Sequence, residues 1–109
     1  MNTRLQGKIA FVTGAGSGIG EATALRFAEE GATVVLCGRR IEPLQGVQDK
    51  IHALGGKADI AVADVSNEQA YVEALQATAQ RHGRLDVLVN NAMAYTWGGI
   101  EAMTTADWH

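Results

Sequence analysis

A glycine-rich segment near the start of the chain has the spacing that most clearly points to chemistry. Thr13 and the glycines at positions 14, 18 and 20 give the pattern Thr-Gly-x-x-x-Gly-x-Gly, directly after an apolar run at residues 9–12. Such a run is typical of a strand buried on both faces, so the segment lies between a strand and the start of a helix. There the first helical N–H groups are unpaired and the helix dipole favours an anion. Because glycine lets a ligand approach the backbone closely, the segment predicts a site for phosphate groups.

The spacing excludes two other nucleotide-binding loops. The pattern Gly-x-Gly-x-x-Gly would need a glycine where Ile19 stands, and a Walker-type loop would end in Gly-Lys-Ser or Gly-Lys-Thr, which is absent here. The alternative without a ligand is a tight turn between the strand and the helix.

Strand and helix patterns alternate along the chain and would position this segment. Apolar runs predict strands at residues 9–13, 33–37, 59–63 and 85–89. Apolar residues at helical spacing predict helices at about residues 18–30, 41–54 and 67–82, and residues 101–109 have the pattern of a partial fourth helix. This alternation indicates an α/β fold with a parallel sheet and helices on both faces, in which ligands bind at the carboxyl ends of the strands. With 109 residues the chain has room for about four strands and not six.

Two local patterns predict details of the helices. The first helix has apolar residues three apart, which we expect on its buried face: Ile19, Ala22, Leu25 and Ala28. Ser66 followed by Gln69 has the spacing of a capping box, which predicts Ser66 as the N-cap of the third helix.

Composition and charge exclude several classes of protein. The 12 acidic residues outnumber the 9 basic ones, which argues against a nucleic-acid partner. No apolar run approaches the roughly 18 residues that span a bilayer, and the N-terminus lacks the apolar core of a secretory signal. The single cysteine, Cys37, excludes an internal disulfide, and the histidines have no metal-ligand spacing, so we expect no metal site and a reducing, cytoplasmic compartment.

Two further motifs make the sequence similar to a known family. Asp64 and Val65 follow the third predicted strand, and the residues Asn90, Asn91 and Ala92 follow the fourth. Together with the glycine segment, and over essentially all 109 residues, the chain resembles the N-terminal part of a short-chain dehydrogenase/reductase. The resemblance implies a Rossmann-type doubly wound parallel sheet, incomplete here, with strand order 3-2-1-4. It makes residues 1–109 the dinucleotide-binding half of a single domain.

The resemblance also assigns cofactor contacts to the ends of the four strands. The pyrophosphate would be held mainly by the backbone of Gly14, Gly18, Ile19 and Gly20. Ser17 would face the adenosine ribose or its phosphate, and Asp64 and Val65 would border the adenine. The adenosine side would be lined, and the sheet braced, by Asn90, Asn91 and Ala92. Met93 departs from the family, which usually has glycine there, and Ser17 replaces a basic residue that some NADP-dependent members carry.

The end of the second strand bears on which nicotinamide cofactor is bound. An acidic residue there would bond the ribose 2′-hydroxyl of NAD, whereas a basic residue suits the 2′-phosphate of NADP. The chain has no acid at this place and instead reads Cys37-Gly38-Arg39-Arg40. A guanidinium bonds a phosphate bidentately, so we favour NADP(H), with Arg39 a better candidate than Arg40. NAD stays open, because Arg39 could stack on the adenine, an NAD enzyme can lack the acid, and both arginines could be ordinary solvated charges.

No catalytic residue can be assigned within the chain. The family uses an Asn, a Ser and a Tyr-x-x-x-Lys pair, but the only lysines are Lys8, Lys50 and Lys57, none of them four residues after a tyrosine. The expectation is therefore a truncated oxidoreductase, inactive alone, whose parent transfers hydride between NADP(H) or NAD(H) and a small-molecule carbonyl/alcohol pair. The alternatives are a non-catalytic dinucleotide-binding module and an inactive fragment that self-associates. The apolar strand at residues 85–89 would be a sheet edge, so a homo-oligomer formed through it is also expected.

Overall fold

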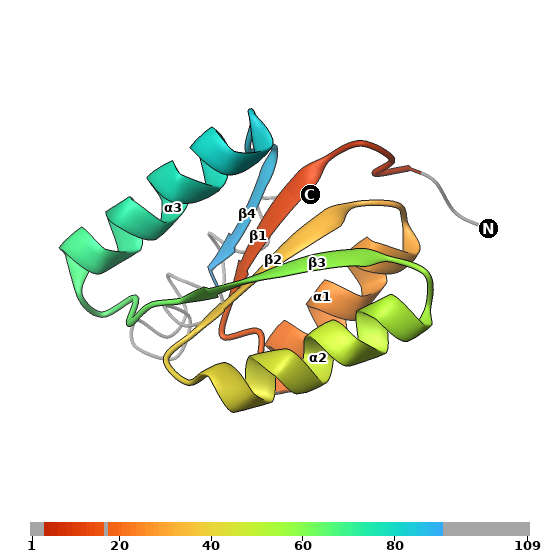
Figure 1. Cartoon of the computed structure of the whole chain (residues 1–109), viewed down its shortest axis with the longest axis horizontal. Coiled ribbons are helices and arrows are strands. Elements are labelled where there is room, and N and C mark those ends of the chain that lie inside the picture. Colours follow the sequence, from red (N-terminus) through yellow and green to blue (C-terminus); the bar gives the residue numbers. More distant parts are fainter. Residues whose placement is uncertain (1–3, 17, 91–109) are drawn as a thin grey trace.

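Four parallel strands form the centre of the fold, in the order β3-β2-β1-β4 (Figure 1). The computed structural model describes residues 4–16 and 18–90. The strands are β1 (Ile9–Thr13), β2 (Thr33–Gly38), β3 (Lys57–Val62) and β4 (Val87–Asn90). The helices between them are α1 (Gly18–Glu29), α2 (Ile41–Ala53) and α3 (Glu68–His82). The predicted Rossmann-type sheet of order 3-2-1-4 with three helices is confirmed, while the partial fourth helix at 101–109 lies outside the described residues.

The strand register brings the carboxyl ends of all four strands to one edge of the sheet. Thr13, the last residue of β1, pairs with Cys37 of β2 on one side and with Asn90 of β4 on the other. Gly38 pairs with Val62, so β2 and β3 also end level with each other. The segments that follow the four strands therefore meet at this edge, which we call the carboxyl edge.

The two faces of the sheet are covered by different helices, and each face has its own core (Figure 1). On the face of α1 and α2, alternate strand residues such as Val12 and Leu36 pack with Leu44 and Ile51. On the face of α3, the core forms around the buried strand residues Ile9, Phe11, Val35 and Cys37. All five residues of β1 are buried, as its nearly continuous apolar sequence predicts for a central strand of a parallel sheet.

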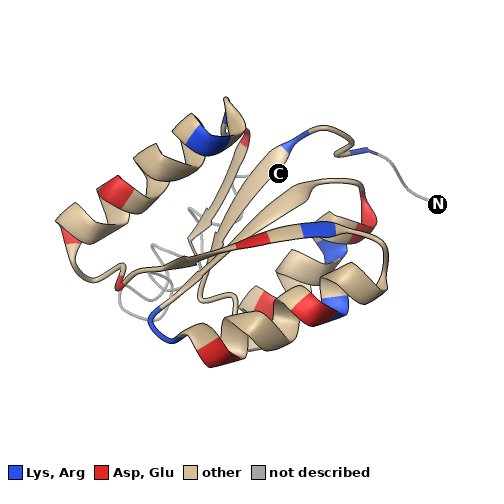
Figure 2. Ribbon diagram, viewed as in Figure 1, with Lys and Arg blue, Asp and Glu red and all other residues tan. Residues whose placement is uncertain are grey.

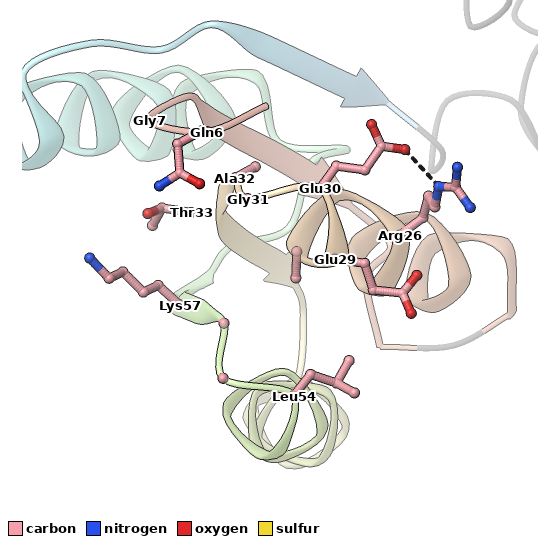
Figure 3. A pocket seen from close by; sticks show the side chains of 13 residues that line it. Gln6, Gly7, Arg26, Glu29, Glu30, Gly31, Ala32, Thr33, Leu54 and Lys57 are labelled. Atoms are coloured by element: carbon pink, nitrogen blue, oxygen red, sulfur yellow. Dashed lines mark hydrogen bonds and ion pairs between the residues drawn. The ribbon is translucent and has the colours of Figure 1, made fainter. Parts of the chain in front are cut away.

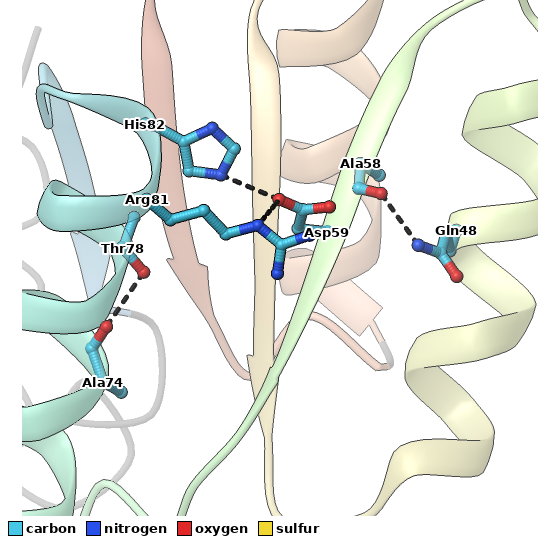
Figure 4. Close-up of polar contacts among 7 residues, drawn as sticks. All are labelled: Gln48, Ala58, Asp59, Ala74, Thr78, Arg81 and His82. Carbon is cyan, nitrogen blue, oxygen red and sulfur yellow. Dashed lines mark hydrogen bonds and ion pairs between the residues drawn. The ribbon is translucent and has the colours of Figure 1, made fainter.

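Polar contacts fix the edge strand β3 to helices on both faces (Figure 4). From α2, the amide of Gln48 donates to the backbone oxygen of Ala58 at 2.8 Å. From α3, Arg81 Nε lies 3.4 Å from Asp59 Oδ2, and His82 Nε2 lies 2.8 Å from the same oxygen.

The predicted buried face of the first helix is confirmed at Leu25 and Ala28 but is wrong at Ile19 and Ala22. Ile19 is 66% exposed and Ala22 is also exposed, whereas the residues of α1 that are buried are Gly20, Ala24 and Ala28. Glycine and alanine at intervals of four residues let the helix backbone lie close to the sheet, so burial follows the small residues rather than the large apolar ones.

The predicted cap of the third helix is also wrong. Its N-cap is Asn67, whose side chain accepts a hydrogen bond from the Ala70 N–H at 3.0 Å. The hydroxyl of Ser66 donates to Asp64 instead, at 2.6 Å, and cannot serve the helix. The bounds of three strands move as well, because β2 ends at Gly38, β3 spans Lys57–Val62 and β4 spans Val87–Asn90. In the part of the chain that the structure describes, no helix is long and apolar enough to cross a membrane.

Candidate functional site

The glycine loop between β1 and α1 lies at the carboxyl edge and turns tightly there. Gly14 and Gly18 have φ angles of 62° and 57°, which side chains other than glycine rarely adopt. A Cβ atom added to Gly20 would lie 1.9 Å from the carbonyl oxygen of Gly14. The first turn of α1 is therefore pressed against the backbone of the loop, and only glycine permits this approach. Ser17 lies outside the described residues.

This arrangement can hold an anion through its backbone. The N–H groups at the opening of a helix have no partner within the helix, and the loop leads directly into α1. Ile19 is in this first turn, with its side chain exposed and its carbonyl oxygen accepting from the Thr23 hydroxyl at 2.8 Å. A cofactor contact made by Ile19 would therefore fall to its backbone, the role that the resemblance implies.

The turn after β2 places two arginines at the same edge. Arg39 and Arg40 are both exposed, and the turn that carries them, between β2 and α2, is blue in Figure 2. The sequence from Gly38 to Arg40 contains no carboxylate that would repel a phosphate. The backbone N–H of Ala63 donates to the Gly38 carbonyl at 2.9 Å, which fixes the end of β2 to the segment after β3.

That segment after β3 carries Asp64, whose carboxylate is held by Ser66. Asp64 Oδ1 accepts from the Ser66 N–H at 2.9 Å and from its hydroxyl at 2.6 Å. These bonds, helped by the positive charge of Arg39, hold the pKa of Asp64 below its ordinary value. Val65 is half-buried and packs against the core under α3.

The end of β4 is joined to the end of β1 by side chains. The Thr13 hydroxyl lies 3.2 Å from Asn90 Oδ1 and 3.3 Å from the Val89 carbonyl oxygen. Asn90 therefore joins the end of β4 to the end of β1 beside the glycine loop. Asn91 and Ala92 lie outside the described residues.

Cys37, beneath the two arginines, is not suited to nucleophilic chemistry. Its side chain is fully buried, and this burial raises the pKa of the thiol to about 11. The thiolate is the reactive form, so the residue is an inert part of the core.

A hollow of about 570 Å³ lies at the opposite edge of the sheet, where the strands begin (Figure 3). It is lined by the last turn of α1 and by the residues that follow α2, with Glu29 and Glu30 among its side chains and Lys57 on the far side. Arg26, which pairs with Glu30, and Lys57 offset the charge of the two glutamates, and the end of α1 presents the partial negative charge of a helix C-terminus. This hollow therefore disfavours a pyrophosphate, and the carboxyl edge remains the candidate site.

Two residues at the carboxyl edge were not assigned to the site by sequence reasoning. Thr13 was named only as the first residue of the glycine pattern, although its hydroxyl contacts Val89 and Asn90 of β4. Ser66 was assigned to the helix, although it holds Asp64. The spacing Asp-x-Ser is typical of a turn in which the aspartate accepts from the residue two positions later, and it could have indicated this bond.

Comparisons with known proteins agree with this geometry. The family described as short chain dehydrogenase matches residues 8–109. A 3-oxoacyl-[acyl-carrier-protein] reductase of Thermotoga maritima is 41% identical over 105 residues, which are 96% of this chain and 43% of that protein. A subunit of (2S)-[(R)-hydroxy(phenyl)methyl]succinyl-CoA dehydrogenase from Thauera aromatica is 39% identical over 95% of this chain and 42% of its own length. The chain thus spans about two fifths of the length of these curated relatives.

Solved structures show the same likeness. A metagenomic short-chain oxidoreductase in complex with NADP is 42% identical, with a TM-score of 0.76, over 78% of this chain and 38% of that one. A hydroxysteroid dehydrogenase from Escherichia coli is 31% identical, with a TM-score of 0.80, over 98% of this chain and 52% of that one. With the family match extending over nearly the whole sequence, this chain belongs to the short-chain dehydrogenase family.

Proposed function

We propose that residues 1–109 are the dinucleotide-binding half of one Rossmann-type domain and that they bind NADP(H) at the carboxyl edge. The observation that carries this proposal is the approach of Gly20 to the Gly14 carbonyl, because it brings the opening of α1 against the backbone of the glycine loop. Backbone N–H groups at that opening would hold the pyrophosphate. The predicted contacts that lie outside the described residues, Ser17, Asn91 and Ala92, belong to the same proposal.

NADP(H) is proposed ahead of NAD(H) because of the charges after β2. Arg39 and Arg40 are exposed, and no acidic residue lies between the end of β2 and the start of α2, so either guanidinium can meet a 2′-phosphate. The hydrogen bond from the Ala63 N–H to the Gly38 carbonyl holds the end of β2, just before Arg39, beside the segment where the adenine would lie. One structural relative at 42% identity is in complex with NADP, which supports the same choice.

The proposed function of the whole protein is that of an oxidoreductase acting on a small-molecule carbonyl/alcohol pair. The bound cofactor would supply or accept the hydride, and the residues described here would orient its adenosine half. The curated relatives named above are a dehydrogenase and a reductase, which supports this class of reaction. Because these 109 residues contain no Tyr-x-x-x-Lys pair, we propose that they bind the cofactor without turning over a substrate. A reducing, cytoplasmic location belongs to the same proposal.

Calorimetric titration with NADPH and NADH tests the cofactor assignment. We expect NADPH to bind more tightly, and Arg39→Ala to weaken NADPH by about tenfold while changing NADH little, since one charged hydrogen bond contributes roughly that factor. Arg26→Ala is the matched control, because it removes the same charge at the opposite edge, where Arg26 pairs with Glu30. Equal affinity for both cofactors in the unaltered chain would overturn the NADP assignment, and binding of neither would overturn the whole proposal.

A further inference from the structure

Ser66 fixes the orientation of the Asp64 carboxylate, although it was not among the predicted cofactor residues. Its backbone N–H and its hydroxyl both donate to the same oxygen, Asp64 Oδ1, at 2.9 and 2.6 Å. Among the described residues, none donates a hydrogen bond to the other oxygen, Oδ2. The two bonds therefore divide the carboxylate into one oxygen that is engaged and one that is available.

The backbone around Asp64 is held as well, so that the position of Oδ2 is defined. The Ala63 N–H donates to the Gly38 carbonyl at the end of β2, at 2.9 Å. On the other side, the Asn67 N–H donates to the Asp64 carbonyl oxygen at 2.9 Å, and Asn67 caps α3. The side-chain torsions of Asp64 are then the freedom that remains, and the bonds from Ser66 restrict them.

The available oxygen has a definite chemical preference. The bonds from Ser66 and the positive charge of Arg39 hold the pKa of Asp64 below its ordinary value, so the carboxylate is ionised at neutral pH. An ionised carboxylate only accepts hydrogen bonds. A group that meets Oδ2 must therefore donate, as the 6-amino group of adenine does and the 6-oxygen of hypoxanthine cannot.

We propose that Ser66 is a positioning residue for recognition of the base: by occupying Oδ1 it leaves Oδ2 aimed as an acceptor, so that the site selects adenine over a 6-oxopurine. This rests on the proposed function, in which Asp64 borders the adenine ring. Ser66 itself touches no part of the cofactor, and it acts through the orientation of Asp64.

The test compares NADP⁺ with its hypoxanthine analogue, nicotinamide hypoxanthine dinucleotide phosphate, by calorimetric titration of the chain. The unaltered chain should bind NADP⁺ about tenfold more tightly than the analogue, the factor expected of one hydrogen bond to a charged group. Ser66→Ala removes the hydroxyl bond but keeps the backbone N–H bond, so it should reduce this preference to about threefold, whereas Ser66→Thr should keep it near tenfold because threonine has the hydroxyl. Asn67→Ala is the control, since it removes the α3 cap and leaves both bonds to Asp64 in place.

Each outcome separates positioning from a purely structural role. If Ser66→Ala weakens both dinucleotides by the same factor, Ser66 only stabilises the loop and the inference is wrong. If Asn67→Ala lowers the preference as much as Ser66→Ala does, the effect comes from α3 and the inference is again wrong. Equal affinity of the unaltered chain for both dinucleotides would overturn the inference and leave the proposed cofactor binding standing. Absence of binding to either one would overturn the proposed function itself.

Discussion

Substitution of Gly20 by alanine should disrupt the glycine loop through a single backbone contact. The new Cβ atom would lie 1.9 Å from the Gly14 carbonyl oxygen and 2.6 Å from the Gly14 carbonyl carbon. Ordinary van der Waals contact needs about 3.5 Å, so α1 and the loop must move apart by more than 1 Å. The obstacle is backbone and cannot rotate away, which places the cost near the upper end of the roughly 1–3 kcal/mol typical of overpacking.

The net magnitude includes a gain from the helix. Alanine in place of glycine within a helix stabilises by about 0.5–1 kcal/mol, which offsets part of the clash. We therefore expect Gly20→Ala to lower the free energy of unfolding by about 2 kcal/mol, a shift of roughly 1 M in the urea midpoint. Cofactor affinity should fall further, because the loop that would hold the pyrophosphate is displaced.

Gly46→Ala is the matched control for this experiment. Gly46 also lies within a helix, α2, and an added Cβ atom would have no neighbour within 4 Å. The same change should therefore raise the free energy of unfolding by about 0.5–1 kcal/mol and leave cofactor binding intact. If Gly20→Ala is as stable as the unaltered chain and binds the cofactor equally well, the close approach of α1 to the loop is not real and the reasoning fails.

Three other predictions concern the sheet and its edges. The side chain of Asp86 accepts a hydrogen bond from the Ile9 N–H, and its backbone N–H donates to the Ile9 carbonyl. Arg84 and the Ile9 N–H hold the pKa of Asp86 below its ordinary value. The ionised carboxylate therefore stabilises the fold above the unfolded-state pKa of about 4, and this stabilisation is lost as pH falls through the pKa of the folded state. Asp86→Asn should thus lower Tm at pH 7 and make little difference near pH 2, and an equal loss at both pH values would contradict this reading. The buried hydroxyl of Tyr71 has no hydrogen-bond partner among the described residues. Tyr71→Phe should therefore leave the free energy of unfolding unchanged or raise it by up to about 1–2 kcal/mol. A clear loss of stability would show that this hydroxyl makes a stabilising hydrogen bond. Because β4 is an edge of the described sheet, light scattering should show concentration-dependent self-association, and a monodisperse monomer at high concentration would refute pairing through that edge.

The architecture could be predicted from the sequence because its signals are local and repeated. The apolar run at residues 9–13 coincides with β1, and the glycine segment after it opens α1 at Gly18. The alternation of strands and helices then leaves a parallel sheet as the natural arrangement, and the strand order came from resemblance to the family.

The details that could not be predicted depend on contacts between distant or competing groups. The buried face of α1 is set by Gly20 meeting Gly14 and by alanines facing the sheet, whereas a search for large apolar residues selects the exposed Ile19. The start of β3 at Lys57 follows from its pairing with Thr33, a partner that no local pattern reveals. Ser66 could cap a helix or bind Asp64, and its sequence is compatible with both until the carboxylate is placed.

The central claim is that backbone N–H groups at the opening of α1 hold the pyrophosphate of a nicotinamide dinucleotide. Titration of the ¹⁵N-labelled chain with NADP⁺, followed by amide chemical shifts, tests it directly. The largest shifts should occur at Gly18, Ile19 and Gly20, with little change at the opposite edge around Gly31 and Gly55. Shifts centred on that opposite hollow, or no shift at the opening of α1 when the cofactor is in excess, would contradict the claim.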